Sequence, residues 1–153
     1  MPEKETLERA AADKRAGKSA STQAGEFVRE EIHHVREGKH GARSAKQTIA
    51  IGLSKARRAG VKLGVPKGTS SRTRAAAARD SAKGRAAASG SHKKGASRTR
   101  SRATREALRH EGHSAATPAA LGRQAHAAAK KRGPAARSAA ARKAARTRAR
   151  RGT

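Results

Sequence analysis

The chain has 153 residues and carries 38 lysines and arginines against 11 acidic residues, so its formal net charge is +27. It contains no cysteine, which excludes disulfide frameworks and thiolate metal sites, and no stretch approaches the roughly 20 apolar residues of a membrane span. Its aromatic content is a single phenylalanine, Phe27, too little for the base-stacking surfaces of single-strand nucleic-acid binders.

Large apolar side chains are concentrated before residue 66, so only that part of the chain can form a core of any size. We expect an all-α fold in which residues 1–63 form a small domain of about three helices, each closed by a glycine. Residues 4–16 are mostly helix-forming and are followed by Gly17. This composition predicts the first helix.

The second helix is predicted over about residues 23–37. Its apolar residues follow helical spacing, with Phe27 beside Val28, Ile32 and Val35 at i, i+4 and i+7. Ser21 or Thr22 is expected to cap its start, and Gly38 to end it.

The third helix carries the clearest start and stop signals. Ser44 and Gln47 have the spacing of a capping box, and Gly60 follows the last turn. One face is predicted to be buried, and it comprises Ala45, Ile49, Gly52, Leu53, Ala56 and Ala59. Basic residues occupy the other side, so this helix is expected to join the core to a cationic surface.

After residue 63 the composition changes to glycine, serine, alanine and basic residues. We interpret residues 64–96 as a flexible basic linker with one helical candidate near 72–83, and residues 97–153 as a basic tail that is largely disordered or helical only when bound. Within that tail, helices are expected at about 97–111, 118–132 and 135–151.

Charge is distributed very unevenly along the chain. The net charge is −1 over residues 1–37, +7 over 38–63 and +21 over 64–153. Such a chain repels itself unless a polyanion neutralises it, so nucleic acid is the expected partner. With Phe27 expected in the core, we favour duplex DNA over RNA, bound through its phosphates with little sequence preference.

The residues expected to contact phosphates lie in the third helix and in the tail: Arg43, Lys46, Lys55, Arg57, Arg58, Lys130, Lys131, Arg132, Arg142, Lys143, Arg146, Arg148, Arg150 and Arg151. Gly41 to Lys46 is the best single phosphate site in the sequence, because it combines basic side chains with amide groups at a helix start.

Nothing in the sequence indicates catalysis, a cofactor or a small-molecule substrate. The seven histidines include the pair His33 and His34 and the turn residue His40, but their spacing matches no zinc motif. We expect His33 and His34 to be partly exposed helix residues, and we expect no metal ligands and no enzyme activity.

The run Gly38 to Val61, with its segment Lys-Gln-Thr-Ile-Ala-Ile-Gly-Leu-Ser-Lys-Ala-Arg-Arg-Ala-Gly, resembles a family of small, basic, uncharacterised bacterial proteins. The preceding Ser-Thr-Gln-Ala-Gly-Glu-Phe-Val-Arg-Glu-Glu-Ile belongs to the same likeness, which covers about the first 63 residues. It implies a bacterial setting but no mechanism. The tail is similar in composition to tails of linker histones and of bacterial histone-like proteins.

The first hypothesis is therefore a cytoplasmic, nucleoid-associated, histone-like protein that is not an enzyme. A second is an RNA-binding or ribosome-associated protein. A third is a protein interaction module, whose acidic helix binds a partner or folds back on the basic tail. The oligomeric state stays open.

Overall fold

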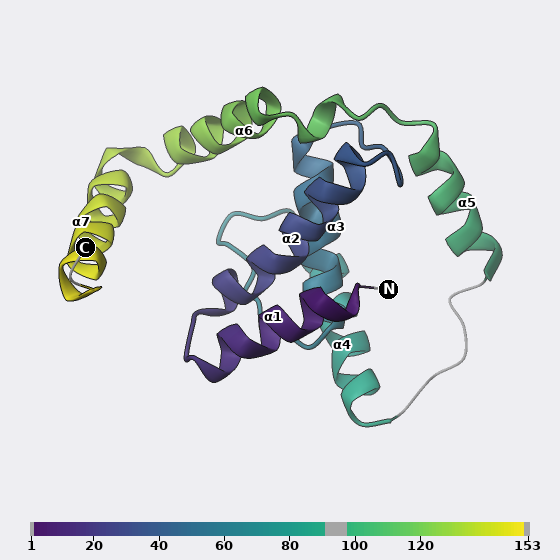
Figure 1. The fold of residues 1–153 in the computed structure, drawn as a ribbon, viewed down its shortest axis with the longest axis horizontal. Coiled ribbons are helices and arrows are strands. Elements are labelled where there is room, and N and C mark those ends of the chain that lie inside the picture. Colours follow the sequence, from purple (N-terminus) through teal and green to yellow (C-terminus); the bar gives the residue numbers. More distant parts are fainter. Residues whose placement is uncertain (1, 91–97, 152–153) are drawn as a thin grey trace. The chain divides into compact units, whose positions relative to one another are not determined.

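The computed structural model describes residues 2–90 and 98–151, and this described part is helical, without any strand (Figure 1). Its elements are α1 (Lys4–Arg15), α2 (Ala20–Arg36), α3 (Ala45–Arg58), α4 (Ser71–Ala88), α5 (Arg98–Arg109), the 3-10 helix η1 (Ser114–Ala116), α6 (Pro118–Lys131) and α7 (Gly133–Arg151). Contacts divide the chain into one compact unit that ends at Thr117 and another that begins at Pro118. The all-α prediction is confirmed.

The predicted glycine stops of the first three helices are also confirmed. Gly17, Gly38 and Gly60 follow α1, α2 and α3 with φ angles of 67°, 72° and 90°. After α3, the Gly60 amide donates to the Arg57 carbonyl, and the amide of the next residue donates to the Ala56 carbonyl. This pair of bonds is the Schellman pattern, which satisfies the last carbonyls of a helix and turns the chain back.

The helix starts agree with the sequence less closely. Ser44 caps α3 as predicted, accepting from the Gln47 amide at 3.3 Å, but the Gln47 side chain accepts from the amide of Arg43 instead of that of Ser44. The predicted start of α2 is wrong, because Ser19 caps it by accepting from the Thr22 amide, and the helix begins at Ala20. The extended backbone of Ser19 places its hydroxyl over the first turn.

The core consists of two clusters built mainly from alanine. The first contains Ala10, Ala24, Phe27 and Ala56, and the second contains Val35, Ala42, Ala115 and Ala116. Phe27 is buried as expected, whereas Ile49 and Leu53 of the predicted apolar face are only partly buried and Ala59 is exposed. Thr48 is fully buried there instead, because a smaller side chain fits between closely spaced helices.

Two glycines mark where helices of the first unit cross most closely. A Cβ at Gly52 of α3 would lie 2.7 Å from the Val28 Cα of α2, and one at Gly84 of α4 would lie 2.3 Å from the Arg57 carbonyl oxygen. Asp80 of α4 also accepts from Ser54 and from the Arg58 Nε, each at 2.7 Å. The helix expected near 72–83 is therefore present as α4, and it packs on α3.

The expectation of a largely disordered tail is wrong for the described residues 98–151, which form α5, η1, α6 and α7. Alanine and arginine have high helix propensity, and here the helices do not require a large apolar face. Ala115 and Ala116 of η1 complete the second core cluster, so a segment beyond residue 97 helps to close the N-terminal core. The expected domain division at residues 63 and 96 stays a prediction.

Gly41 is where the chain between α2 and α3 meets the segment after α5. Its amide donates to the Leu108 carbonyl at 2.8 Å, and a Cβ at Gly41 would lie 1.8 Å from the Glu111 carbonyl oxygen. We therefore expect Gly41→Ala to detach this segment while α1, α2 and α3 stay helical. Hydrogen exchange should show faster exchange at the amides of residues 41 and 42. Unchanged protection of these two amides would contradict the close approach.

Candidate functional site

The unit that begins at Pro118 presents most of the predicted phosphate contacts on exposed helix surfaces. Lys130, Lys131, Arg132, Arg142, Lys143, Arg146, Arg148 and Arg150 are all exposed. Arg151 ends α7, and its side chain lies outside what the structure describes. Arg142, Lys143, Arg146 and Arg150 line one shallow surface pocket along α7, so these four cations share one face of that helix.

The predicted contacts in the first unit are in more varied surroundings. Lys46 is exposed, and Arg43 is exposed although its guanidinium lies 3.2 Å from Glu111. Arg58 is paired with Asp80. Arg57 is half-buried, and its buried Nε has no hydrogen-bond partner in residues 2–90 and 98–151. The structure therefore does not gather these residues into one free cationic surface.

Three amide groups of the predicted phosphate site at 41–46 already have partners. The amides of Gly41 and Ala42 donate to the carbonyls of Leu108 and Gly112, and the amide of Arg43 donates to the Gln47 side chain. A phosphate would have to displace these three bonds, so only the amides at the start of α3 are left to bind it.

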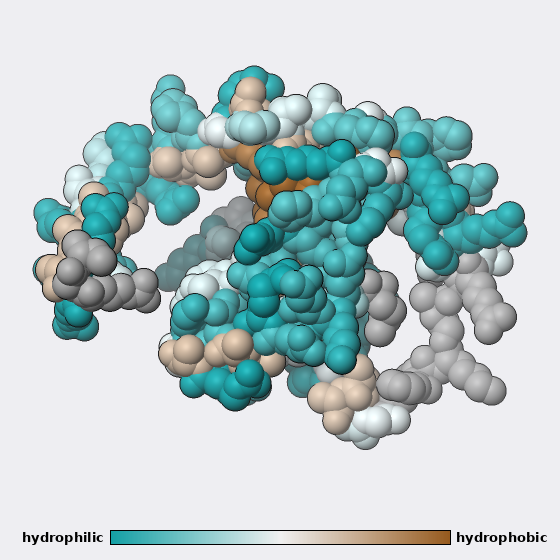
Figure 2. Space-filling view, viewed as in Figure 1, coloured by the Kyte–Doolittle hydropathy of each residue, from teal (hydrophilic) through white to brown (hydrophobic). Residues whose placement is uncertain are grey.

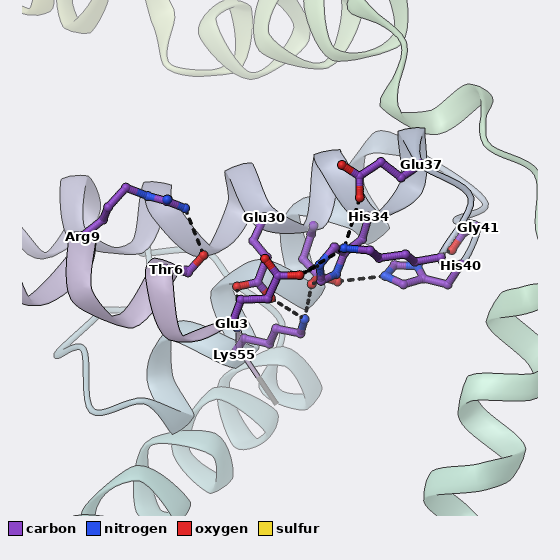
Figure 3. Close-up of polar contacts among 11 residues, drawn as sticks. Glu3, Thr6, Arg9, Glu30, His34, Glu37, His40, Gly41 and Lys55 are labelled. Carbon is purple, nitrogen blue, oxygen red and sulfur yellow. Dashed lines mark hydrogen bonds and ion pairs between the residues drawn. The ribbon is translucent and has the colours of Figure 1, made fainter.

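Lys55, also among the predicted phosphate contacts, is paired with a buried cluster of carboxylates. Its Nζ lies 3.0 Å from the Glu30 Oε1 and also contacts the Glu31 Oε1, and these two glutamates are 3% and 0% exposed (Figure 3). Burial by itself disfavours the Lys55 charge, but hydrogen bonds to Glu31 and Glu30 leave its pKa above the usual value. The charge of Lys55 is therefore not available to a phosphate.

Pairing with Lys55 also shifts the pKa of Glu30. Burial raises the pKa of this carboxyl, yet the hydrogen bonds from Lys55 and from the Glu3 amide lower it overall. The Glu3 amide reaches the Glu30 Oε2 at 3.1 Å, so the residue just before α1 is fixed against α2.

Glu3 extends this cluster toward solvent. Its Oε1 lies 2.8 Å from the His34 Nε2 and 3.1 Å from the Lys39 Nζ (Figure 3). The hydrogen bond with His34, together with that from Lys39, lowers the pKa of Glu3 to about 2. Two histidines lie close to Glu31: His34 from α2 and His40 from the turn after it. Their rings pack edge to face, with centroids 6.0 Å apart.

The buried cluster was missed because charged residues were assigned to the solvent-facing side of each helix. Glu31 is four residues after Phe27 and four before Val35, which places it within the apolar stripe of α2. Lys55 is seven residues after Thr48, so it belongs to the buried face of α3. An acid and a base on two facing apolar stripes are the signal that could have revealed the pair.

Residues 12–69 match the profile of a family of unknown function, DUF6496. The DUF6496 match spans α2 and α3 and contains Glu30, Glu31, His34, His40 and Lys55, whereas α6 and α7 lie outside it. Comparison with curated proteins and with solved structures gave no significant match. Among the described residues, no helix combines the length and apolarity needed to cross a membrane.

Proposed function

We propose that the protein binds duplex DNA without catalysing a reaction, through phosphate contacts made by the unit that begins at Pro118. One observation carries the proposal: this segment has 11 lysines and arginines and no acidic residue. The exposed surface of α7 alternates hydrophilic residues with small apolar ones, so its cations are open to a partner (Figure 2).

The four cations on one face of α7 suit a phosphate backbone. Arg142 and Arg150 are eight residues apart, so the row extends about 12 Å along the helix axis at 1.5 Å per residue. Duplex DNA carries a negative charge about every 1.7 Å of its axis, and each neutralised phosphate releases counterions. Binding of this kind is salt-dependent and indifferent to sequence, as a histone-like role in the nucleoid would require.

Duplex binding is favoured over single-strand binding. The sequence has one phenylalanine, Phe27, and no tyrosine or tryptophan, and Phe27 is 1% exposed. It is therefore unavailable to stack on an unpaired base. The acidic residues of α2 do not favour the model of an acidic helix that covers the tail. Glu26 is paired with Arg9, and Glu30 and Glu31 are paired with Lys55, all within the first unit.

The proposal is tested by measuring DNA affinity across a salt series, with Arg142, Lys143, Arg146 and Arg150 all changed to glutamine. If each contacts one phosphate, the slope of log affinity against log salt should become shallower by up to about 3.6, at about 0.9 per contact. The matched control changes the same number of exposed cations in the first unit, namely Lys14, Arg15, Lys62 and Lys67. This control variant loses the same amount of charge, but its slope of log affinity against log salt should stay close to that of the unmodified chain.

Equal losses in the two variants would contradict the assignment to α7 and would indicate an effect of net charge alone. Duplex RNA and single-stranded DNA are measured in parallel. Tighter binding to duplex RNA would favour the RNA-binding hypothesis, and a preference for single strands would overturn the duplex proposal.

A further inference from the structure

The carboxylate of Glu31 is the most deeply buried charged group in the cluster, and within the described part of the chain one of its oxygens lacks a hydrogen bond. The residue is 0% exposed, and its buried Oε2 has no hydrogen-bond partner among the residues that the structure describes, while Lys55 contacts the Oε1. The His40 Nε2 lies 3.3 Å from the Oε2. A buried carboxylate oxygen in this situation normally requires a cationic or hydrogen-donating partner.

The hydrogen bonds of the two histidines decide which ring nitrogens can meet that requirement. The His40 Nδ1 lies 3.0 Å from the Gly41 carbonyl oxygen, which can only accept, so Nδ1 carries a proton. The His34 Nε2 likewise donates to the Glu3 carboxylate at 2.8 Å. If both rings are neutral, the remaining nitrogens, His40 Nε2 and His34 Nδ1, carry lone pairs that point toward Glu31. The His34 Nδ1 lies 3.6 Å from the Glu31 Oε1.

Three donor atoms with lone pairs therefore converge on one point. One ligand atom from each of Glu31, His34 and His40 lies within 4.8 Å of the others. Donors around a tetrahedral zinc ion, at about 2.1 Å from the metal, stand about 3.4 Å apart. Side-chain shifts would bring these three donors to that spacing and leave the fourth position open.

The charged groups around the cluster have a net negative charge, which favours a cation. With neutral imidazoles, four carboxylates and two ammonium groups give a net charge of −2. The carboxylates are Glu3, Glu30, Glu31 and Glu37, and the ammonium groups are Lys39 and Lys55. A divalent cation at this position would neutralise that charge.

We propose that Glu31, His34 and His40 bind a divalent transition-metal ion such as Zn²⁺. Two imidazoles and one carboxylate form a ligand set suited to this class of metal. The outer ring nitrogens donate to a carboxylate and to a backbone carbonyl, which are the supports that metal-bound histidines usually have. Lys55 holds the other oxygen of Glu31 and so orients the carboxylate.

The local fold explains how residues without a zinc motif come together. Glu31 and His34 are three residues apart on α2 and share a face. The positive φ of Gly38 turns the chain, and the His40 ring comes to lie beside the His34 ring (Figure 3). A surface pocket that includes Glu3, His34 and Lys39 gives an ion access beside His34. The bound ion would fix the end of α2 to the following turn.

The proposal is tested by calorimetric titration of the metal-free full chain with Zn²⁺. We expect one tight equivalent, a thermal transition that rises with zinc concentration, and a loss of affinity of at least about 100-fold in His40→Gln. His33→Gln is the matched control, because His33 is exposed on the same helix and lies outside the three-residue group. Glu3→Gln should weaken binding by about 10- to 100-fold, as expected for a supporting residue.

Nitrogen NMR of the histidine rings in the unmodified chain provides a second measurement that needs no variant. Zinc should shift the His34 Nδ1 and His40 Nε2 resonances and leave those of His33 unchanged. Equal zinc binding by all variants, or no response of these two nitrogens in the folded protein, would overturn the proposal. A His40 ring with both nitrogens protonated at neutral pH and insensitive to zinc would also do so. The test is independent of DNA binding.

Discussion

Replacing Lys55 with methionine is expected to lower the free energy of unfolding by about 3 to 5 kcal/mol. The variant retains most of the side-chain volume but leaves Glu30 and Glu31, which are 3% and 0% exposed, without their shared cation. Breaking a buried ion pair on one side costs about this much, because an uncompensated charge stays in the interior. Urea unfolding followed by circular dichroism measures the change.

Lys46→Met is the control, since Lys46 is exposed on the same helix and should change stability by no more than about 0.5 kcal/mol. If both variants unfold at the same urea concentration, the buried pair does not stabilise the unit. Adding Glu30→Gln and Glu31→Gln to the Lys55 variant should recover part of the lost stability.

The two proteins should differ in pH dependence: between pH 7 and 5 the stability of the unmodified chain should change little through Glu30, whereas that of the Lys55 variant should rise. In the unmodified chain the pKa of Glu30 is lowered below 4.5, so its contribution is present above that pH and is lost as pH falls through the folded pKa. Without Lys55, burial is expected to raise the pKa of Glu30, so folding takes up protons and stability increases on acidification from pH 7. A parallel pH dependence in both proteins would contradict this assignment.

Gly52→Ala should destabilise the first unit by about 2 kcal/mol, although alanine is the better helix former. The new Cβ would lie 2.7 Å from the Val28 Cα and 3.0 Å from the Phe27 carbonyl oxygen, so backbone atoms would have to move. Overpacking of this kind typically costs about 1 to 3 kcal/mol. Thermal unfolding is the measurement.

Gly25→Ala is the matched substitution, because Gly25 is an exposed glycine within α2 and a Cβ there meets nothing within 4 Å. It should stabilise by about 0.5 to 1 kcal/mol, from helix propensity alone. Stabilisation by both substitutions would show that α2 and α3 do not cross closely at Gly52.

Local signals in the sequence predicted the fold better than long-range ones. The stops at Gly17, Gly38 and Gly60 and the cap at Ser44 depend on residues a few positions apart, and each was recognisable. The packing of α4 on α3 was not, because it depends on a missing side chain at Gly84 and on a bond from Arg58 to Asp80. Neither feature has a periodic signature.

The buried cluster was hidden for a related reason. Glu31 and His34 share a helix, but His40 reaches them through a turn whose path depends on Gly38, and Lys55 comes from another helix. Charge composition alone identified the exposed cations of α7, where no tertiary contact is needed to present them. It could not show that Lys55 is neutralised within the core.

The alanine-rich core has a consequence for the heat capacity of unfolding. Six of the eight residues in the two core clusters are alanine, and the larger members are Phe27 and Val35. Because the heat-capacity change follows the apolar area that unfolding exposes, it should be small for a chain of 153 residues. The curve of stability against temperature should accordingly be shallow, with a broad melting transition and a low urea m-value.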